Sequence, residues 1–258
     1  MKRIVILFAA MITLCGCSTL AKINWDPEYL AYAANSALTA ATITDAQVAA
    51  LCVATVQQLD AQNKIENGNY LRRLNRVMAG INEVGGLKLN YKVYQTNEVN
   101  AFACGDGSIR VYTGLMDVMN DEELLAVIGH EVGHVMRQHS LKAMRSAYLA
   151  TAARGVIAAA GGTVGTLAAS QLGQIGEAYL SSQFSQKQEL DADDYGFQFA
   201  IDHGKSPYSL YNALEKLNKL SQGSQMSSVQ QMFSSHPDSA ARATRMKEKA
   251  DAYAKKAQ

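Results

Sequence analysis

The sequence has no excess of charge of either sign, because its 24 lysine and arginine residues are balanced by 23 aspartate and glutamate residues. No basic patch stands out along the chain, so nucleic-acid binding is not expected. Proline is scarce, with three among 258 residues. So few helix breakers favour a mainly helical protein, and the length suits one globular domain with a small helical appendage.

The N-terminus has the composition of a targeting segment. Lys2 and Arg3 form a charged start, and residues 4–14 form an apolar stretch of signal-peptide length. Residues 1–16 are therefore predicted to be a signal peptide. The next part, residues 17–44, is predicted to be a tether followed by an N-terminal helix.

Cysteine is scarce too, and two of the four cysteines lie at the end of this signal, where residues 14–18 read LCGCS. This segment resembles a bacterial lipoprotein signal, with the lipid attached to Cys17. Lipidation at Cys15 and a plain secretory signal are the less favoured alternatives. Because Ser18, and no aspartate, follows Cys17, the resemblance implies an outer-membrane location that faces the periplasm.

The remaining cysteines, Cys52 and Cys104, form an even pair. The periplasm is oxidising, so such a pair is predicted to form a disulfide. The bridge would pin an N-terminal helix to the sheet region. The alternative is two separate buried thiols.

A change of hydrophobic period from helical to alternating predicts a small antiparallel sheet within the domain 45–258. Its strands are expected near residues 89–94, 100–103 and 109–113. The last of these is interpreted as an exposed edge strand that receives an extended substrate peptide. Asn100, Ile109 and Val111 are therefore candidate substrate-binding residues, and an ordinary buried strand is the alternative.

The central motif of the chain is HEVGH at residues 130–134, an instance of H-E-x-x-H within a helical pattern. Four residues apart on a helix, His130 and His134 share a face and can bind one metal ion. Glu131 lies about 100° further round, beside the ion. Two ligands, a flanking base and room for a water are the arrangement of a zinc hydrolase.

An acidic cluster further along the chain is predicted to supply the second half of this metal site. Glu189 and Asp193 are also four residues apart, so a helix presents both on one face. Glu189 is predicted to be the third ligand, and Asp193 to accept a hydrogen bond from a ligand imidazole. Asp191 is the fallback ligand, and a solvated acidic helix face is the alternative to any site.

Three histidines lie outside these motifs. His139 and His203 have no partners at ligand spacing and are expected to be surface or capping residues. His236 precedes Pro237 and, from its own surroundings, is a turn residue.

Residues 155–176 carry no charge, but they are rich in small and polar residues and poor in leucine, isoleucine and phenylalanine. A helical hairpin or lid over the active-site cleft is favoured for this segment. A transmembrane span is the weaker alternative, because such residues insert poorly.

Taken together, three motifs resemble one family over roughly residues 45–246: HEVGH, then Glu189 with Ala192-Asp193, then Ser235-His236-Pro237 followed by Arg242. The family is that of the gluzincin peptidases, which include the bacterial heat-shock protease HtpX and the CAAX prenyl proteases. Within it, the sequence is most similar to the small periplasmic lipoproteins of LoiP type. The resemblance implies an α+β, mainly helical, zincin-like fold.

The resemblance also implies roles for individual residues. One zinc ion per chain is bound by His130, His134 and Glu189. Glu131 is the general base and Asp193 supports the ligands. His236 either donates to the tetrahedral oxyanion or occupies the open zinc position in a resting state, and Arg242 holds that segment in place.

We therefore expect a zinc-dependent endopeptidase, tethered to the outer membrane, that cleaves misfolded or stalled envelope proteins alongside the outer-membrane assembly machinery. Processing of prenylated proteins is not expected, because no convincing hydrophobic span follows the signal. The rival hypothesis is a zinc-stabilised periplasmic chaperone or assembly factor with little or no proteolysis. A metallophosphatase or nuclease is disfavoured by the lack of a carboxylate-rich two-metal set.

Overall fold

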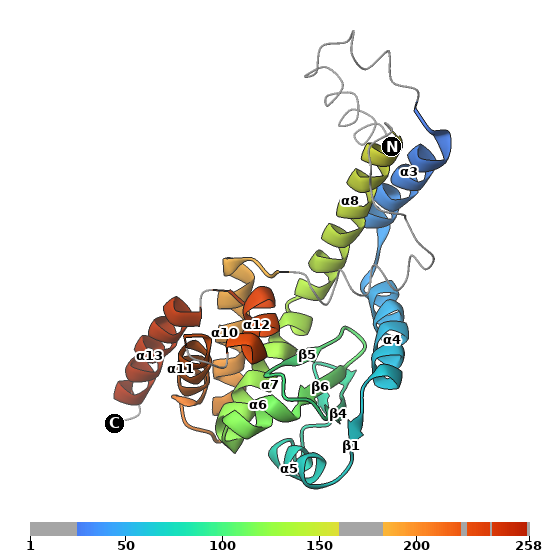
Figure 1. Cartoon of the computed structure of the whole chain (residues 1–258). Coiled ribbons are helices and arrows are strands. Elements are labelled where there is room, and N and C mark those ends of the chain that lie inside the picture. Colours follow the sequence, from blue (N-terminus) through green and yellow to red (C-terminus); the bar gives the residue numbers. More distant parts are fainter. Residues whose placement is uncertain (1–24, 160–182, 223–225, 238, 257–258) are drawn as a thin grey trace. The chain divides into compact units, whose positions relative to one another are not determined.

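A computed structural model describes residues 25–159, 183–222, 226–237 and 239–256 (Figure 1). The predicted signal peptide and the lipidation site Cys17 lie outside these residues. So does the uncharged segment from residue 160 onward. Predictions about those parts of the chain therefore stay predictions.

The chain divides into two compact units. In the smaller one, helix α3 (Pro27–Thr42) packs against the part of α8 (His139–Ala159) that follows Met144. A Cβ placed on Gly155 would lie 3.0 Å from the Cβ of Ala33, so a small residue is needed at this helix contact. The larger unit begins at Ile43 and holds the remaining described elements, while the part of α8 after Met144 belongs to the smaller unit.

The larger unit contains a four-stranded sheet in the order β1 (Ile65–Glu66), β4 (Asn90–Tyr94), β6 (Ser108–Tyr112) and β5 (Ala101–Ala103). A separate two-stranded ribbon pairs β2 (Glu83–Val84) with β3 (Leu87–Lys88), and in the sequence it lies between β1 and β4. The α+β, mainly helical class is as predicted, but the sheet is mixed and not antiparallel. The chain makes a β5–β6 hairpin and inserts β6 next to β4, so β4 and β6 run parallel.

The same insertion overturns the interpretation of residues 109–113 as an edge strand. β6 has a partner on each side, and Ile109 and Val111 are 0% exposed. All the backbone groups that an edge strand would offer to a peptide are used or covered there. The outer strand at this side of the described sheet is β5, which Asn100 precedes. The Asn100 side chain accepts a hydrogen bond from the Ala101 N–H at 2.9 Å.

Helix α7 (Asp121–Met136) forms the centre of the larger unit, with β5 on one side and helices α10 (Gln186–Asp202) and α11 (Ser209–Ser221) on the other (Figure 1). The remaining helices surround this centre: α4 (Asp45–Gln62), α5 (Asn69–Val77), α6 (Thr113–Val118), α12 (Met226–Ser235) and α13 (Ser239–Lys256). A capping box starts α7, because Asn120 and Glu123 each bond the other's backbone N–H.

Glycines set how closely α7 and α10 approach each other. A Cβ on Gly196 of α10 would lie 2.9 Å from both the Ala126 carbonyl oxygen and the His130 nitrogen. A Cβ on Gly133 of α7 would lie 2.8 Å from the Cβ of Tyr195. Added methyl groups would push backbone atoms apart, which close-packed interiors tolerate poorly. This contact explains why a helix carries glycine inside the HEVGH motif.

The two cysteines outside the signal meet where α4 faces the β5–β6 turn. Cys52 and Cys104 are both buried, and both are free thiols in this structure. The Gly105 N–H donates a hydrogen bond to the Cys52 sulfur at 3.2 Å. Ligand atoms of Cys52, Cys104 and Asp106 all lie within 4.8 Å of one another. The fold therefore brings Cys52 and Cys104 close together, while the disulfide between them stays a prediction.

Within the described ranges, no single helix is both long enough and apolar enough to cross a membrane. Helices α3 and α4 meet the criteria of length and hydropathy only when taken together as a bent pair.

Candidate metal centre

Three elements of the larger unit bring the predicted ligands together. Helix α7 supplies His130 and His134, α10 supplies Glu189, and the turn after α12 supplies His236. All four side chains are buried, and one ligand atom from each lies within 4.8 Å of the others. The spacing of four residues predicted that His130 and His134 share one face of α7, and both side chains lie on the face turned toward the Glu189 carboxylate of α10.

The distances between these atoms are those of a metal's coordination shell. His134 Nε2 lies 3.0 Å from His130 Nε2 and 3.3 Å from Glu189 Oε1. His236 Nδ1 lies 3.0 Å from the same carboxylate oxygen and 3.4 Å from His130 Nε2. Ligands bound to zinc at their usual bond lengths are about 3.3 Å apart in a tetrahedron. The four residues could therefore hold one metal ion between three imidazole nitrogens and one carboxylate oxygen.

The chemistry of the donor set points the same way. Two imidazole nitrogens facing each other at 3.0 Å share at most one proton, and both lie beside a buried carboxylate. A divalent cation satisfies all of these lone pairs at once. Imidazole and carboxylate ligands suit zinc among several divalent metals.

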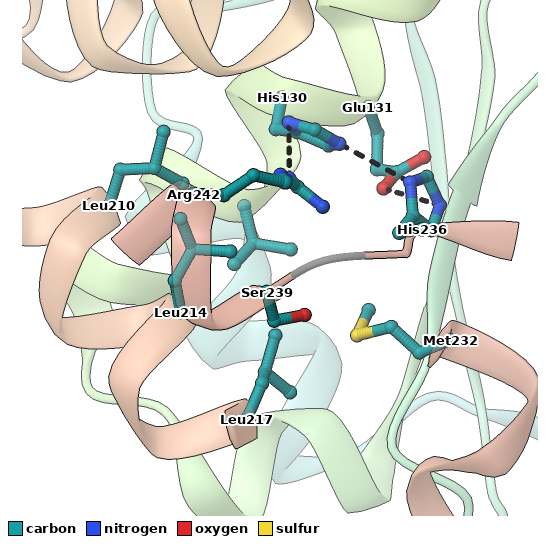
Figure 2. A pocket seen from close by; sticks show the side chains of 10 residues that line it. His130, Glu131, Leu210, Leu214, Leu217, Met232, His236, Ser239 and Arg242 are labelled. Atoms are coloured by element: carbon teal, nitrogen blue, oxygen red, sulfur yellow. Dashed lines mark hydrogen bonds and ion pairs between the residues drawn. The ribbon is translucent and has the colours of Figure 1, made fainter. Parts of the chain in front are cut away.

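Two buried residues, Arg242 and Asp193, contact the ligand residues His130 and Glu189. His130 Nδ1 lies 3.0 Å from Asp193 Oδ1, which fixes the orientation of that ring. Arg242 donates two hydrogen bonds to Asp193, from Nε at 2.8 Å and from Nη2 at 2.6 Å. Its Nη1 also pairs with Glu189 Oε2 at 2.5 Å. Figure 2 shows Arg242 below His130, with its Nη2 3.5 Å from His130 Nδ1.

Glu131 lies beside the donor cluster and is not part of it. Its Oε1 is 3.5 Å from His236 Nε2, and Figure 2 shows the two side chains side by side above the pocket. Burial raises the pKa of the Glu131 carboxyl above its usual range, although the neighbouring histidines oppose the rise. A carboxylate that holds a proton more readily than usual is suited to take one from water and give it away again.

Burial and neighbouring charges also shift the pKa values of His236 and Asp193. Burial lowers the pKa of His236, but the Glu131 and Glu189 carboxylates outweigh it, so the net shift is upward. Burial would raise the pKa of Asp193, yet hydrogen bonds from Arg242 and His130 lower it to about 2. Asp193 is therefore a permanent anion at neutral pH, as a fixed hydrogen-bond acceptor should be.

A small pocket, partly open to solvent, adjoins the site (Figure 2). One end carries the polar groups of His130, Glu131 and His236. Its apolar wall comes from α7, α11 and α12, namely Val127, Leu210, Leu214, Leu217 and Met232, and α13 adds Ser239 and Arg242. An apolar pocket with a few convergent polar groups at one end is the usual form of a substrate-binding site.

Not every predicted residue lies here. Asp191, the fallback ligand, is outside the donor cluster, and its side chain is 49% exposed. Asn100, Ile109 and Val111 belong to the sheet and are not among the residues that line the pocket. His203 forms the C-cap of α10, as expected of a capping residue.

His139 was interpreted wrongly, because it is buried and touches the site. Its Nδ1 lies 3.1 Å from His134 Nδ1, and only 1% of the residue is exposed. Helical spacing does not bring residues 134 and 139 together. Here α7 ends at Met136, and Gln138, with a φ of 56°, turns the chain so that α8 starts with His139 beside His134. Glutamine rarely takes a positive φ, so periodicity offered no signal.

Phe184 was also missed. Its ring stacks on His134 with a centroid distance of 3.8 Å, and its N–H donates to the Ser235 carbonyl just before His236. It lies before the N-cap of α10, where the sequence shows no pattern that points to the site.

Comparison with known proteins places this geometry in a family. Residues 66–250 match the sequence profile of Peptidase family M48. The chain is 41% identical to Metalloprotease LoiP of Escherichia coli K12, over 97% of both chains. It is 38% identical to Metalloprotease YcaL of the same organism, over 83% of this chain and 84% of the relative.

More distant similarities cover only part of the other protein. The chain is 29% identical to the Beta-barrel assembly-enhancing protease of Yersinia pestis, over 65% of this chain but only 36% of that one. It overlaps the crystal structure of S. mikatae Ste24p at 19% identity, with a TM-score of 0.47, over 78% of this chain and 55% of the other. The profile match and the two long alignments decide the assignment: this chain belongs to peptidase family M48 and is a metalloprotease.

Proposed function

We propose that this metalloprotease is a zinc-dependent endopeptidase whose metal is held by His130, His134 and Glu189. The observation that carries the proposal is the set of donor distances of 3.0 to 3.4 Å, with Glu131 standing beside it. A scaffold that used the metal only for stability would need the donors but not a buried carboxylate next to them that is outside the donor set.

Zinc bound there would polarise the scissile carbonyl and make a water molecule more acidic. Glu131 takes a proton from the water as the water oxygen attacks the carbonyl carbon. The same carboxyl then delivers that proton to the leaving nitrogen as the C–N bond breaks. Asp193 and Arg242 hold His130 and Glu189 in place during these steps.

His236 occupies the fourth donor position in this structure, where a catalytic site needs room for water. We therefore favour the resting-state role among its two predicted roles. Withdrawal of the turn that carries His236 would free this position.

The outer strand β5 replaces β6 as the proposed contact for the substrate backbone. β5 packs against α7, the helix that carries the site, and it has a neighbour on one side only within the described sheet. An extended peptide added there would lie antiparallel or parallel to residues 101–103 through main-chain hydrogen bonds.

The location and natural substrates that we propose rest on the N-terminal sequence and on the names of relatives. The lipoprotein-type signal with Cys17 supports a lipid anchor in the outer membrane, facing the periplasm. Misfolded or stalled envelope proteins are the proposed substrates. The name of one relative refers to enhanced β-barrel assembly, which supports the outer-membrane assembly machinery as a partner.

Metal removal tests the proposed activity. We expect the mature protein to cleave casein, to lose cleavage after dialysis against a zinc chelator, and to regain it with one equivalent of zinc per chain. Bound zinc measured by mass spectrometry should follow the activity. Stoichiometric zinc without cleavage, in a protein that still prevents aggregation of unfolded clients, would favour the chaperone hypothesis. Cleavage that persists without metal would contradict the proposal.

The proposed Cys52–Cys104 disulfide has its own test. In an oxidising compartment, a disulfide-bearing oxidant would accept the two electrons as the adjacent sulfurs join. We expect neither Cys52 nor Cys104 to give a free thiol when the mature protein, isolated from the periplasm, is denatured without reductant. Two thiols should appear after reduction. Two free thiols in the unreduced protein would exclude the bridge, and the Cys52→Ala variant serves as the single-thiol standard.

A further inference from the structure

We infer that His139 is a positioning residue for the metal ligand His134: it accepts a hydrogen bond from His134 Nδ1 and so fixes the tautomer that binds metal. The inference rests on the proposed metal centre and assigns a role to a side chain outside the donor set. It follows from the contacts of both ring nitrogens of His134.

The two nitrogens of His134 face different surroundings. Nε2 points to the other donors, 3.0 Å from His130 Nε2 and 3.3 Å from Glu189 Oε1. Nδ1 points away from them, 3.1 Å from His139 Nδ1. A neutral imidazole carries one proton, and a nitrogen that binds metal must present its lone pair. The proton of His134 therefore belongs on Nδ1, from where it is donated to the Nδ1 lone pair of His139.

The same reasoning assigns the proton of His139. Because its Nδ1 accepts, its proton lies on Nε2, which is directed at Asp191 Oδ2 at 3.9 Å. The chain of contacts runs from His134 through His139 to a partly exposed carboxylate. Asp191 thus favours the required tautomer of His139 from a distance longer than a direct hydrogen bond.

The two histidine ligands consequently have different supports. His130 Nδ1 faces the Asp193 carboxylate directly, at 3.0 Å, while His134 Nδ1 faces a neutral imidazole. The surroundings of His134 leave little alternative, because Phe184 stacks on its ring face at a centroid distance of 3.8 Å. Without His139, the Nδ1–H would be buried and unsatisfied, and the tautomer that cannot bind metal would become equally accessible.

A purely structural role makes a different prediction from a positioning role. If His139 only fills space, an apolar side chain of similar size preserves metal binding. If it acts as an acceptor, a side chain with an acceptor atom at the Nδ1 position preserves binding and an apolar one does not. Asparagine places its amide oxygen near that position, and leucine fills a similar volume without an acceptor.

The experiment compares His139→Asn, His139→Leu and His139→Ala with the unsubstituted chain. Zinc affinity is measured by competition with a chromophoric chelator, and the tautomer of His134 by ¹⁵N chemical shifts of the zinc-loaded protein. We expect a 10- to 100-fold weaker affinity for Leu and Ala, roughly the known cost of losing such a partner, and less than threefold for Asn. The Nδ1–H signal of His134 should persist in the Asn variant.

Thermal unfolding of the metal-free proteins separates positioning from folding. The inference requires that affinity differ between Asn and Leu or Ala more than metal-free stability does. Equal affinities in all variants, or losses that simply follow the stability of the metal-free protein, would overturn it. If the Leu variant does not fold, the Asn–Ala comparison decides. An unsubstituted chain that binds no zinc would instead refute the proposed metal centre.

Discussion

Replacing Glu131 with glutamine should reduce peptide cleavage by about 100-fold or more while the protein still binds one zinc ion. The amide has nearly the shape of the carboxylate but cannot take a proton from water. Glu131 is buried, and burial already raises the pKa of its carboxyl, so a neutral side chain is tolerated at this position. Glu131 also lies outside the donor set, so the ligands are untouched.

The measurement is the rate of casein cleavage per bound zinc, with circular dichroism as a check of the fold. Glu122→Gln is the matched control, since Glu122 lies on the same helix but is exposed at its first turn. We expect the control to cleave at the unsubstituted rate. A Glu131→Gln variant that retains a tenth or more of the activity would show that another group accepts the proton.

Replacing Arg242 with leucine should destabilise the metal-free protein by about 3–5 kcal/mol. The Arg242 side chain is 3% exposed and pairs with Asp193 and Glu189, neither of which is exposed at all. Its removal leaves two buried carboxylates without their cation. One of them, Asp193, also supports His130, so zinc affinity should fall as well.

Arg245→Leu on the same helix provides the control. Arg245 pairs with Asp194, the neighbour of Asp193, at 2.6 Å, but its side chain is 36% exposed. An exposed pair of this kind contributes about 1 kcal/mol or less. Urea denaturation of the metal-free variants measures both effects. Similar losses for the two substitutions would contradict the view that the buried Arg242 network holds the site together.

Much of the site was readable without coordinates. The spacing of His130 and His134, and that of Glu189 and Asp193, predicted two helix faces that share one metal, because residues four apart on a helix point the same way. The Asn120–Glu123 capping box marked where the active helix begins. These predictions rest on geometry within one helix, where sequence separation and spatial separation are simply related.

Predictions that required the pairing of distant segments were less secure. The predicted strand at residues 109–113 agrees with β6 except at Thr113, which starts α6, but whether a strand lies at the edge or the centre depends on its neighbours. The alternation of side chains is the same in both cases. Cys52 and Cys104 were expected to meet, and they do, but their proximity alone does not determine whether the two sulfurs are joined.

The sequence by itself determined the family, the mainly helical class, and the residues that α7 and α10 present to each other, since helical periodicity and local motifs encode all of these. The tertiary structure alone decided that β6 is a central strand, that His236 Nδ1 lies 3.0 Å from the Glu189 carboxylate, and that His139 Nδ1 lies 3.1 Å from His134 Nδ1. Each of these depends on how closely separate segments approach, as at Gly196 against His130, and on a turn at Gln138 that no periodic pattern specifies.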